Sequence, residues 1–285
     1  MHLILILLSL GFALSWRWIY VLGSATWRQR WQRALLSLII PPLMLLMSAI
    51  AVIWMGPQGW MLGHPTGWLG YGLAWMLWGW AVVLGFSLAR DGWKSIQQVR
   101  RYPQIQVHGF TARLLENPIL FCAQIGFWHP ELVISQGLLE TLTPDQQKAV
   151  LIHEQAHNYY KDTFWFFGLG WCRRLTAWLP GTEALWQELL LLRELRADQW
   201  AAQHIDPLLL AESLLLVVRQ PITISEENSA AFSCTAPPNR FTERIEALIN
   251  SSASIEPEPS SNYWNWSWMI FVFLPLISVP FHHSC

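Results

Sequence analysis

Apolar and polar positions divide the chain into long apolar runs around a more polar middle. Residues 34–56 and 68–89 are uncharged and apolar over enough positions to cross a bilayer as helices. Residues 263–281 form a similar run behind a cluster of tryptophans. Residues 3–16 are also apolar and end at Arg17, which allows either a cleaved signal peptide or a membrane helix with a snorkelling arginine. Since no Lys or Arg precedes this run, we prefer the helix.

The middle of the chain, residues 105–250, has the turn residues and charges of a folded polar domain. Three strand-like pieces, "IQVHG", "ILFCAQIG" at 119–126 and "ELVIS" at 131–135, predict a small sheet. The piece at 119–126 is either an edge strand, onto which an extended peptide could add, or an ordinary core strand.

A capping box predicts a helix over about 144–160. Thr143 is the expected N-cap, Pro144 takes the first helical position, and Gln146 lies three residues after Thr143. Two further helices are expected, at about 183–204 and from Pro207 to Gln220. Residues 163–179 are too short to span a bilayer, and we interpret them as an interfacial or re-entrant element, with a buried helix as the alternative.

The composition indicates membrane lipid as a partner. Of the 285 residues, 53% are hydrophobic and 13% are charged, about half the charged fraction of a soluble domain. The 20 tryptophans favour a membrane–water boundary. The net charge of −1 gives no reason to expect nucleic acid, and the four scattered cysteines predict buried thiols rather than a disulfide framework or a cysteine zinc site.

Basic residues predict how the chain is oriented. The connection before the first long run contains Arg17, Arg28, Arg30 and Arg33, the turn at 57–67 is uncharged, and Arg90, Lys94, Arg100 and Arg101 follow the second long run. By the positive-inside rule, residues from about 105 onward face the cytoplasm of a cell inner or plasma membrane. We therefore expect a membrane region at 1–104 with three transmembrane helices, a cytoplasmic domain at 105–255, and a linker with a last membrane helix at 256–285.

The pattern His153-Glu154-x-x-His157 is the candidate chemistry. The two histidines are four apart, so their rings leave one helix face at the separation that suits a single zinc ion. Glu154 would lie beside the position where the metal activates water. The alternative is a surface helix with two solvated histidines, which the apolar neighbours of the pattern disfavour.

A carboxylate pair on the next helix can complete the zinc site. Glu194 is the candidate third ligand, and Asp198, four residues later on the same face, is a candidate partner for a ligand imidazole. The alternative is an exposed salt-bridged face with Arg193 and Arg196. Asp162 is either a second such partner or a solvated residue at a helix end.

These motifs together resemble the integral-membrane gluzincin metallopeptidases. The pattern is most similar to antirepressor metallopeptidases of the BlaR/MecR type, and the HtpX and CAAX-prenyl-protease family is related. The similarity covers about residues 105–250. Besides the motifs above, the matching residues are Gly126, Pro130, Gly137, Leu138, Ala149, Val150 and Leu151.

The resemblance implies roles and a fold. His153, His157 and Glu194 would bind Zn²⁺, and Glu154 would be the catalytic base. The fold would be an α-helical membrane protein with an α+β zincin-like catalytic domain, a small sheet plus the two ligand helices. Two departures from the pattern are Ala236-Pro237-Pro238, where relatives have His-Pro, and a short carboxyl end without room for a penicillin-binding sensor.

The expected function is a membrane zinc endopeptidase that acts on a protein or peptide substrate. It would cut a repressor or itself in signal relay, or cut membrane-protein substrates in proteostasis. The candidate donors for the oxyanion are Arg244, Arg240, His204 and Tyr160. The alternative is a non-enzymatic membrane sensor or scaffold in which the zinc site is structural or vestigial.

Overall fold

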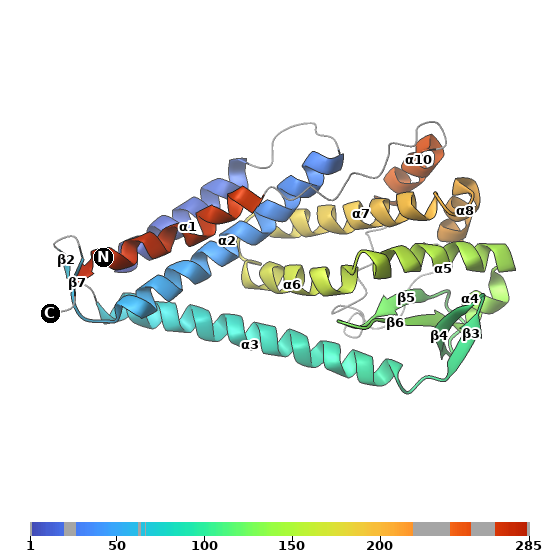
Figure 1. Cartoon of the computed structure of the whole chain (residues 1–285), viewed down its shortest axis with the longest axis horizontal. Coiled ribbons are helices and arrows are strands. Elements are labelled where there is room, and N and C mark those ends of the chain that lie inside the picture. The colour runs from blue at the N-terminus through green and yellow to red at the C-terminus, as the bar shows by residue number, and fades with distance from the viewer. Residues whose placement is uncertain are drawn as a thin grey trace. The chain divides into compact units, whose positions relative to one another are not determined.

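The computed structural model describes residues 2–19, 27–61, 64–65, 67–218, 240–251 and 266–283. The chain divides into two compact units, and each is described by itself. The first unit consists of Met1–Ser87, Trp171–Leu189 and Glu258–Cys285, and the second consists of Leu88–Gly170 and Leu190–Pro257. Helices α3 (Trp68–Val99), α6 (Asp162–Leu175) and α7 (Thr182–Ala201) each continue from one unit into the other. The protein is mostly helical, with a small mixed sheet in the second unit (Figure 1).

The first unit contains the first of the two long apolar helices and most of the second. Helices α2 (Trp27–Met55) and α3 are long and apolar enough to span a membrane, as predicted from residues 34–56 and 68–89. Helix α2 continues through Pro41 and Pro42.

The amino-terminal run is helix α1 (His2–Ile19). The expectation that Arg17 snorkels toward water is wrong for this structure, because its residue is only 3% exposed. The Arg17 guanidinium donates a 3.4 Å hydrogen bond to the Thr176 hydroxyl, which gives the buried charge a polar partner.

The last apolar run does not form the single α-helix that its hydropathy predicts. Its described part is a 3₁₀ turn η2 (Trp266–Met269), a short α11 (Ile270–Phe273) and a second 3₁₀ segment η3 (Leu274–Phe281). Pro275 and Pro280 lie in η3, and since proline has no backbone N–H, each removes a donor that a regular helix needs. The predicted linker at 256–262 and Ala236–Pro238 lie outside the described residues.

Three two-residue strands, β1 (Trp60–Met61), β2 (His64–Pro65) and β7 (His282–His283), form a small sheet in this unit.

The sheet of the second unit has four strands rather than the three predicted. Its order is β3 (Gln104–Val107), β4 (Phe110–Leu115), β6 (Glu131–Ser135) and β5 (Cys122–Ile125), so β5 is an edge strand. The β4–β6 pair is parallel and the other two pairs are antiparallel. Strand β4 was missed because its turn, His108-Gly109, lacks an Asn-Gly or Asp-Gly signal, although both residues have the positive φ of a tight hairpin, 49° and 85°.

Helix α5 (Pro144–Tyr159) packs between the sheet and other helices of the second unit. The capping box is confirmed, since the Thr143 hydroxyl accepts from the Gln146 N–H and the Gln146 side chain accepts from the Thr143 N–H. Leu151 packs with sheet residues and with α4 (Gln136–Thr141). Ile152 packs in a second cluster with residues of α7, α8 (Pro207–Val218) and α10 (Phe241–Ser251). This packing fixes the helix that contains the candidate metal ligands.

Candidate metal centre

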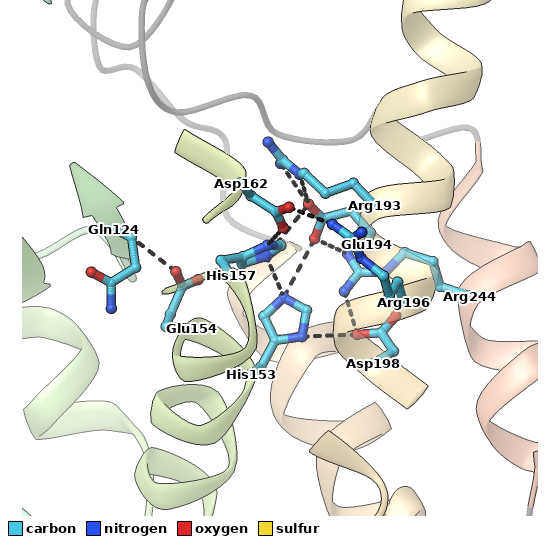
Figure 2. Close-up of polar contacts among 10 residues, drawn as sticks. All are labelled: Gln124, His153, Glu154, His157, Asp162, Arg193, Glu194, Arg196, Asp198 and Arg244. Carbon is cyan, nitrogen blue, oxygen red and sulfur yellow. Dashed lines mark hydrogen bonds and ion pairs between the residues drawn. The ribbon is translucent and has the colours of Figure 1, made fainter. Parts of the chain in front are cut away.

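Helix α5 presents both histidines to α7. His153 and His157 are 3% and 8% exposed, and their rings meet edge to face. The two Nε2 atoms lie 3.3 Å apart. Figure 2 shows the two imidazole rings next to each other. The interpretation of the pattern as two solvated surface histidines is therefore wrong.

Helix α7 brings a carboxylate to the same point. Glu194 is 6% exposed, and its two oxygens lie 3.4 Å from His153 Nε2 and 3.7 Å from His157 Nε2. One ligand atom from each of these three residues lies within 4.8 Å of the others. The tertiary structure thus brings Glu194, which follows His157 by 37 residues, into one buried group with the two histidines.

The other ring nitrogens face carboxylates that orient the histidines. His157 Nδ1 lies 2.8 Å from Asp162 Oδ2, and His153 Nδ1 lies 2.9 Å from Asp198 Oδ1. Both aspartates are 2% exposed, so Asp162 is not a solvated residue at a helix end. A carboxylate beside Nδ1 fixes the orientation of the ring, so that Nε2 is the nitrogen a metal ion can bind, the arrangement that commonly supports ligand histidines.

Arginines pair with each of these three carboxylates. Arg244 of α10 donates from Nε and a terminal nitrogen to the two Asp198 oxygens, both at 2.7 Å. Arg193 donates to Glu194 Oε1 at 2.6 and 3.0 Å. Arg196 donates to Asp162 Oδ1 and lies over the Tyr160 ring. The predicted alternative of an exposed ion-paired face is half right, because the ion pairs exist but Arg193 and all three carboxylates are buried.

The buried carboxylates make the histidines basic. Burial by itself would lower the pKa of His157, but the charge of Glu194 and the hydrogen bond with Asp162 raise it to about 10. Burial by itself would also lower the pKa of His153, but the hydrogen bonds with Asp198 and Glu194 raise it. Burial would raise the pKa of Glu194, but Arg193 and His157 hold it well below its ordinary value. A site that retains protons so strongly also attracts a divalent cation, which displaces those protons when it binds.

The spacing of the ligand atoms fits one metal ion. Ligands about 2.0–2.1 Å from a tetrahedral zinc ion lie about 3.3–3.4 Å from one another. The Nε2 atoms of His153 and His157 are 3.3 Å apart, and His153 Nε2 is 3.4 Å from Glu194 Oε2. Two imidazole lone pairs that face each other at this distance are stabilised by a cation between them. The group can therefore hold a metal ion, and its two nitrogens and one carboxylate suit zinc and also iron(II).

Glu154 lies on the side of the group that faces the sheet. Its Oε2 accepts a 3.2 Å hydrogen bond from the backbone N–H of Gln124 in β5 (Figure 2). Burial, more than any neighbouring charge, raises the pKa of Glu154. Among the four carboxylates discussed, Glu154 is the one bound by a backbone amide instead of an arginine, so it is the best placed to exchange protons.

Some site residues could not be identified from the pattern. Gln124 contributes a backbone N–H, which leaves no side-chain signal in the sequence. Arg244 was predicted as an oxyanion donor, and the structure places its guanidinium against Asp198 and 3.4 Å from Glu194. Of the other predicted donors, Tyr160 places its ring against the Arg196 guanidinium. The His204 ring lies against the Trp200 ring, and its Nδ1 is hydrogen-bonded to the Trp200 carbonyl oxygen.

No family model and no curated protein matches this chain. The metal-ligand group is therefore identified by the positions of its own side chains.

Proposed function

We propose that the chain is a membrane-bound zinc endopeptidase that hydrolyses peptide bonds of protein substrates at the cytoplasmic face. The observation that carries the proposal is the arrangement of Glu154 beside a group able to hold a metal ion. His153, His157 and Glu194 form that group, and the Glu154 carboxyl is close enough to both histidines to interact with them electrostatically. Two histidines and one glutamate are the ligand set of many hydrolytic zinc sites, where a fourth position takes water or substrate.

Zinc bound by these residues would supply Lewis acidity that lowers the pKa of water and polarises a peptide carbonyl. Glu154 would take a proton from water while the water oxygen bonds to the carbonyl carbon. Glu154 would then give that proton to the amide nitrogen as the carbon–nitrogen bond breaks. The products are a carboxylic acid and an amine, and Glu154 returns to its starting charge.

The position of strand β5 at the edge of the sheet favours a peptide as the substrate. β5 is an edge strand, and its Gln124 N–H donates to Glu154. An extended peptide that adds to such an edge is held by main-chain hydrogen bonds, which require no particular sequence. Its scissile bond would then lie next to Glu154.

The membrane location is proposed from the apolar helices and the basic residues. Helices α2 and α3 have the length and hydropathy of membrane spans, and the arginines predict a cytoplasmic second unit. Aromatic residues support interfacial placement of 163–179. Phe127 contacts Phe164 and Phe167 of α6, and the neighbouring Trp128 is 70% exposed.

Cysteine labelling tests this orientation. Gln58→Cys and Lys148→Cys, in a Cys234→Ser and Cys285→Ser background, would be exposed to a membrane-impermeant maleimide in intact cells and after lysis. Position 58 should react in intact cells and position 148 only after lysis. The reverse pattern would overturn the proposed orientation.

The catalytic proposal is tested by metal content and cleavage. The protein would be purified in detergent without chelator, and its metal would be measured together with cleavage of an unfolded protein. We expect one zinc per chain in the parent and in Glu154→Gln, with cleavage in the variant reduced by a factor of about 10² or more. Glu140→Gln, an exposed position on α4, is the matched control and should behave as the parent.

Other outcomes separate the alternatives. A parent without metal, or a Glu154 variant as active as the parent, would overturn the peptidase proposal. Iron in place of zinc would overturn the assignment of the metal, and iron without cleavage would overturn the hydrolytic assignment as well. Bound zinc with no cleavage of any protein would favour a non-enzymatic sensor or scaffold. A repressor that is cut specifically would favour signal relay over membrane proteostasis.

A further inference from the structure

A pocket of about 430 Å³ in the second unit is lined by Gln124, whose N–H binds Glu154, and by Gln155, the residue that follows Glu154. Residues of the sheet form one wall, and Leu151, Gln155 and Asn158 of α5 form another. Its volume is in the range of about 300–1,000 Å³ that is common for ligand pockets. The proposed chemistry at Glu154 does not use this space.

Four carboxamide side chains give the pocket its chemical character. Gln104, Gln155 and Asn158 are exposed, Gln124 is partly exposed, and all four line the pocket. Within the described part of the chain, none of these carboxamides makes a hydrogen bond. A carboxamide offers both donors and an acceptor, the same combination that a peptide group requires from its partner.

The side chains that line the pocket have no net charge, and exposed Arg100 lies outside this lining. The two charged lining residues are Arg113 and Glu131, and Arg113 Nε lies 2.6 Å from Glu131 Oε2. Arg100 binds the other Glu131 oxygen at 3.0 Å. A charged ligand would lose hydration here without gaining an opposite charge, whereas a neutral polar ligand can replace its water by carboxamides.

Gln124 connects the pocket to the candidate metal centre. Its backbone N–H binds Glu154, while its side chain lines the pocket and points away from the two histidines (Figure 2). Gln155 directly follows Glu154 on α5. Gln124 is therefore common to the strand that contacts Glu154 and to the pocket.

We infer that this pocket is a substrate subsite that binds an uncharged polar segment of the polypeptide next to the cleaved bond. The inference rests on the proposed peptidase function and specifies its substrate class. Selectivity comes from hydrogen bonds of the carboxamides to peptide groups and neutral side chains. Substrates with Glu or Lys in that segment are bound and cut less well than substrates with Gln.

The test changes the charge of the pocket in both directions. Gln155→Lys and Gln155→Glu would be compared with the parent on peptides of one sequence in which a single position, scanned along the chain, is Gln, Glu or Lys. At one scanned position the parent should prefer Gln. At that position, the kcat/KM of the Glu peptide divided by that of the Lys peptide should rise about tenfold in Gln155→Lys. The same ratio should fall about tenfold in Gln155→Glu. Gln97→Lys, an exposed position on α3, is the matched control and should leave the ratio unchanged.

Binding separates this inference from the peptidase proposal. The same fluorescent peptides would be titrated into Glu154→Ala protein and into the Glu154→Ala, Gln155→Lys double variant, with anisotropy as the readout. Opposite charge preferences in binding would support the subsite even if the parent cuts nothing, in which case only the catalytic proposal fails. Cleavage and binding that are equal for Gln, Glu and Lys at every position, in the parent and both variants, would overturn the subsite.

Discussion

Arg244 binds both carboxylate oxygens of Asp198 at 2.7 Å, and its remaining terminal nitrogen lies 3.4 Å from Glu194 Oε2. One guanidinium from α10 thereby holds the carboxylate that orients His153 and contacts the candidate metal ligand itself. Because its donors are directed at these carboxylates, we interpret Arg244 as a positioning residue rather than an oxyanion donor.

Arg244→Lys should weaken metal binding. Lysine keeps the charge but cannot bind both oxygens of Asp198 in a planar fork, so His153 loses its fixed orientation. We expect zinc affinity to fall by about 10-fold to 100-fold, as measured by competition with a chromogenic chelator. The same change at exposed Arg101 should have no effect. Unchanged zinc affinity together with a lower kcat would instead assign Arg244 to the oxyanion.

Asp162→Asn should have a similar effect through the other histidine. The His157 Nδ1–H would lose its carboxylate partner, and Arg196 would lose a counter-charge. Zinc affinity should fall by about 10-fold to 100-fold. The control is Asp145→Asn in the first turn of α5, which should cost at most about 1 kcal/mol of unfolding free energy and leave zinc affinity unchanged. Equal zinc affinities in parent and Asp162→Asn would show that Asp162 does not orient a ligand.

Gly137→Ala should destabilise the second unit. A Cβ at Gly137 would lie 2.0 Å from the Pro118 carbonyl oxygen, and the Gly137 N–H donates to the Asn117 carbonyl. Relief of that clash requires backbone movement in the segment that leads into β5. We expect the unfolding free energy to fall by about 1–3 kcal/mol or more, measured by thermal unfolding in detergent.

Gly168→Ala on α6 is the matched control for Gly137→Ala. No atom lies within 4 Å of a Cβ built there, and alanine favours a helix. Its stability should be unchanged or rise by about 0.5–1 kcal/mol. A Gly137 variant as stable as this control would contradict the close approach to Pro118.

Glu131→Gln should give a pH-dependent loss of stability. Burial would raise the pKa of Glu131, but hydrogen bonds from Arg113 and Arg100 outweigh it and lower that pKa. The ionised carboxylate therefore stabilises the fold above its ordinary pKa of about 4.3, and this contribution disappears as the pH falls through the lower native pKa. At pH 7 the variant should lose about 1 kcal/mol or less.

The measurement for Glu131→Gln is thermal unfolding of parent and variant across pH. Their difference should shrink as the solution is acidified below about pH 4. Glu116→Gln, at an exposed position, should show a smaller difference at pH 7. A difference that stays constant across this range would mean that the arginine contacts do not depend on the charge of Glu131.

Local features of the site were predictable because their partners are near in sequence. The capping box joins Thr143 and Gln146 within one turn, and the spacing of His153 and His157 places both on one helix face. Glu194 and Asp198 are also four residues apart, so they lie on one face of α7. Strand β4 was not predicted, since its hairpin lacks the usual turn residues, and the final apolar run forms 3₁₀ segments where two prolines remove backbone donors.

The apolar helices, the helix with its capping box and the residue types able to bind a metal could all be predicted from the amino-acid sequence. Each depends on periodicity, composition or short-range hydrogen bonds. Three contacts became known from the three-dimensional structure: Glu194 faces both histidines, Arg244 pairs with Asp198 across 46 positions, and the Gln124 N–H donates to Glu154. Such contacts depend on how α5, α7, α10 and an edge strand pack, and a single sequence carries no local signal of that packing.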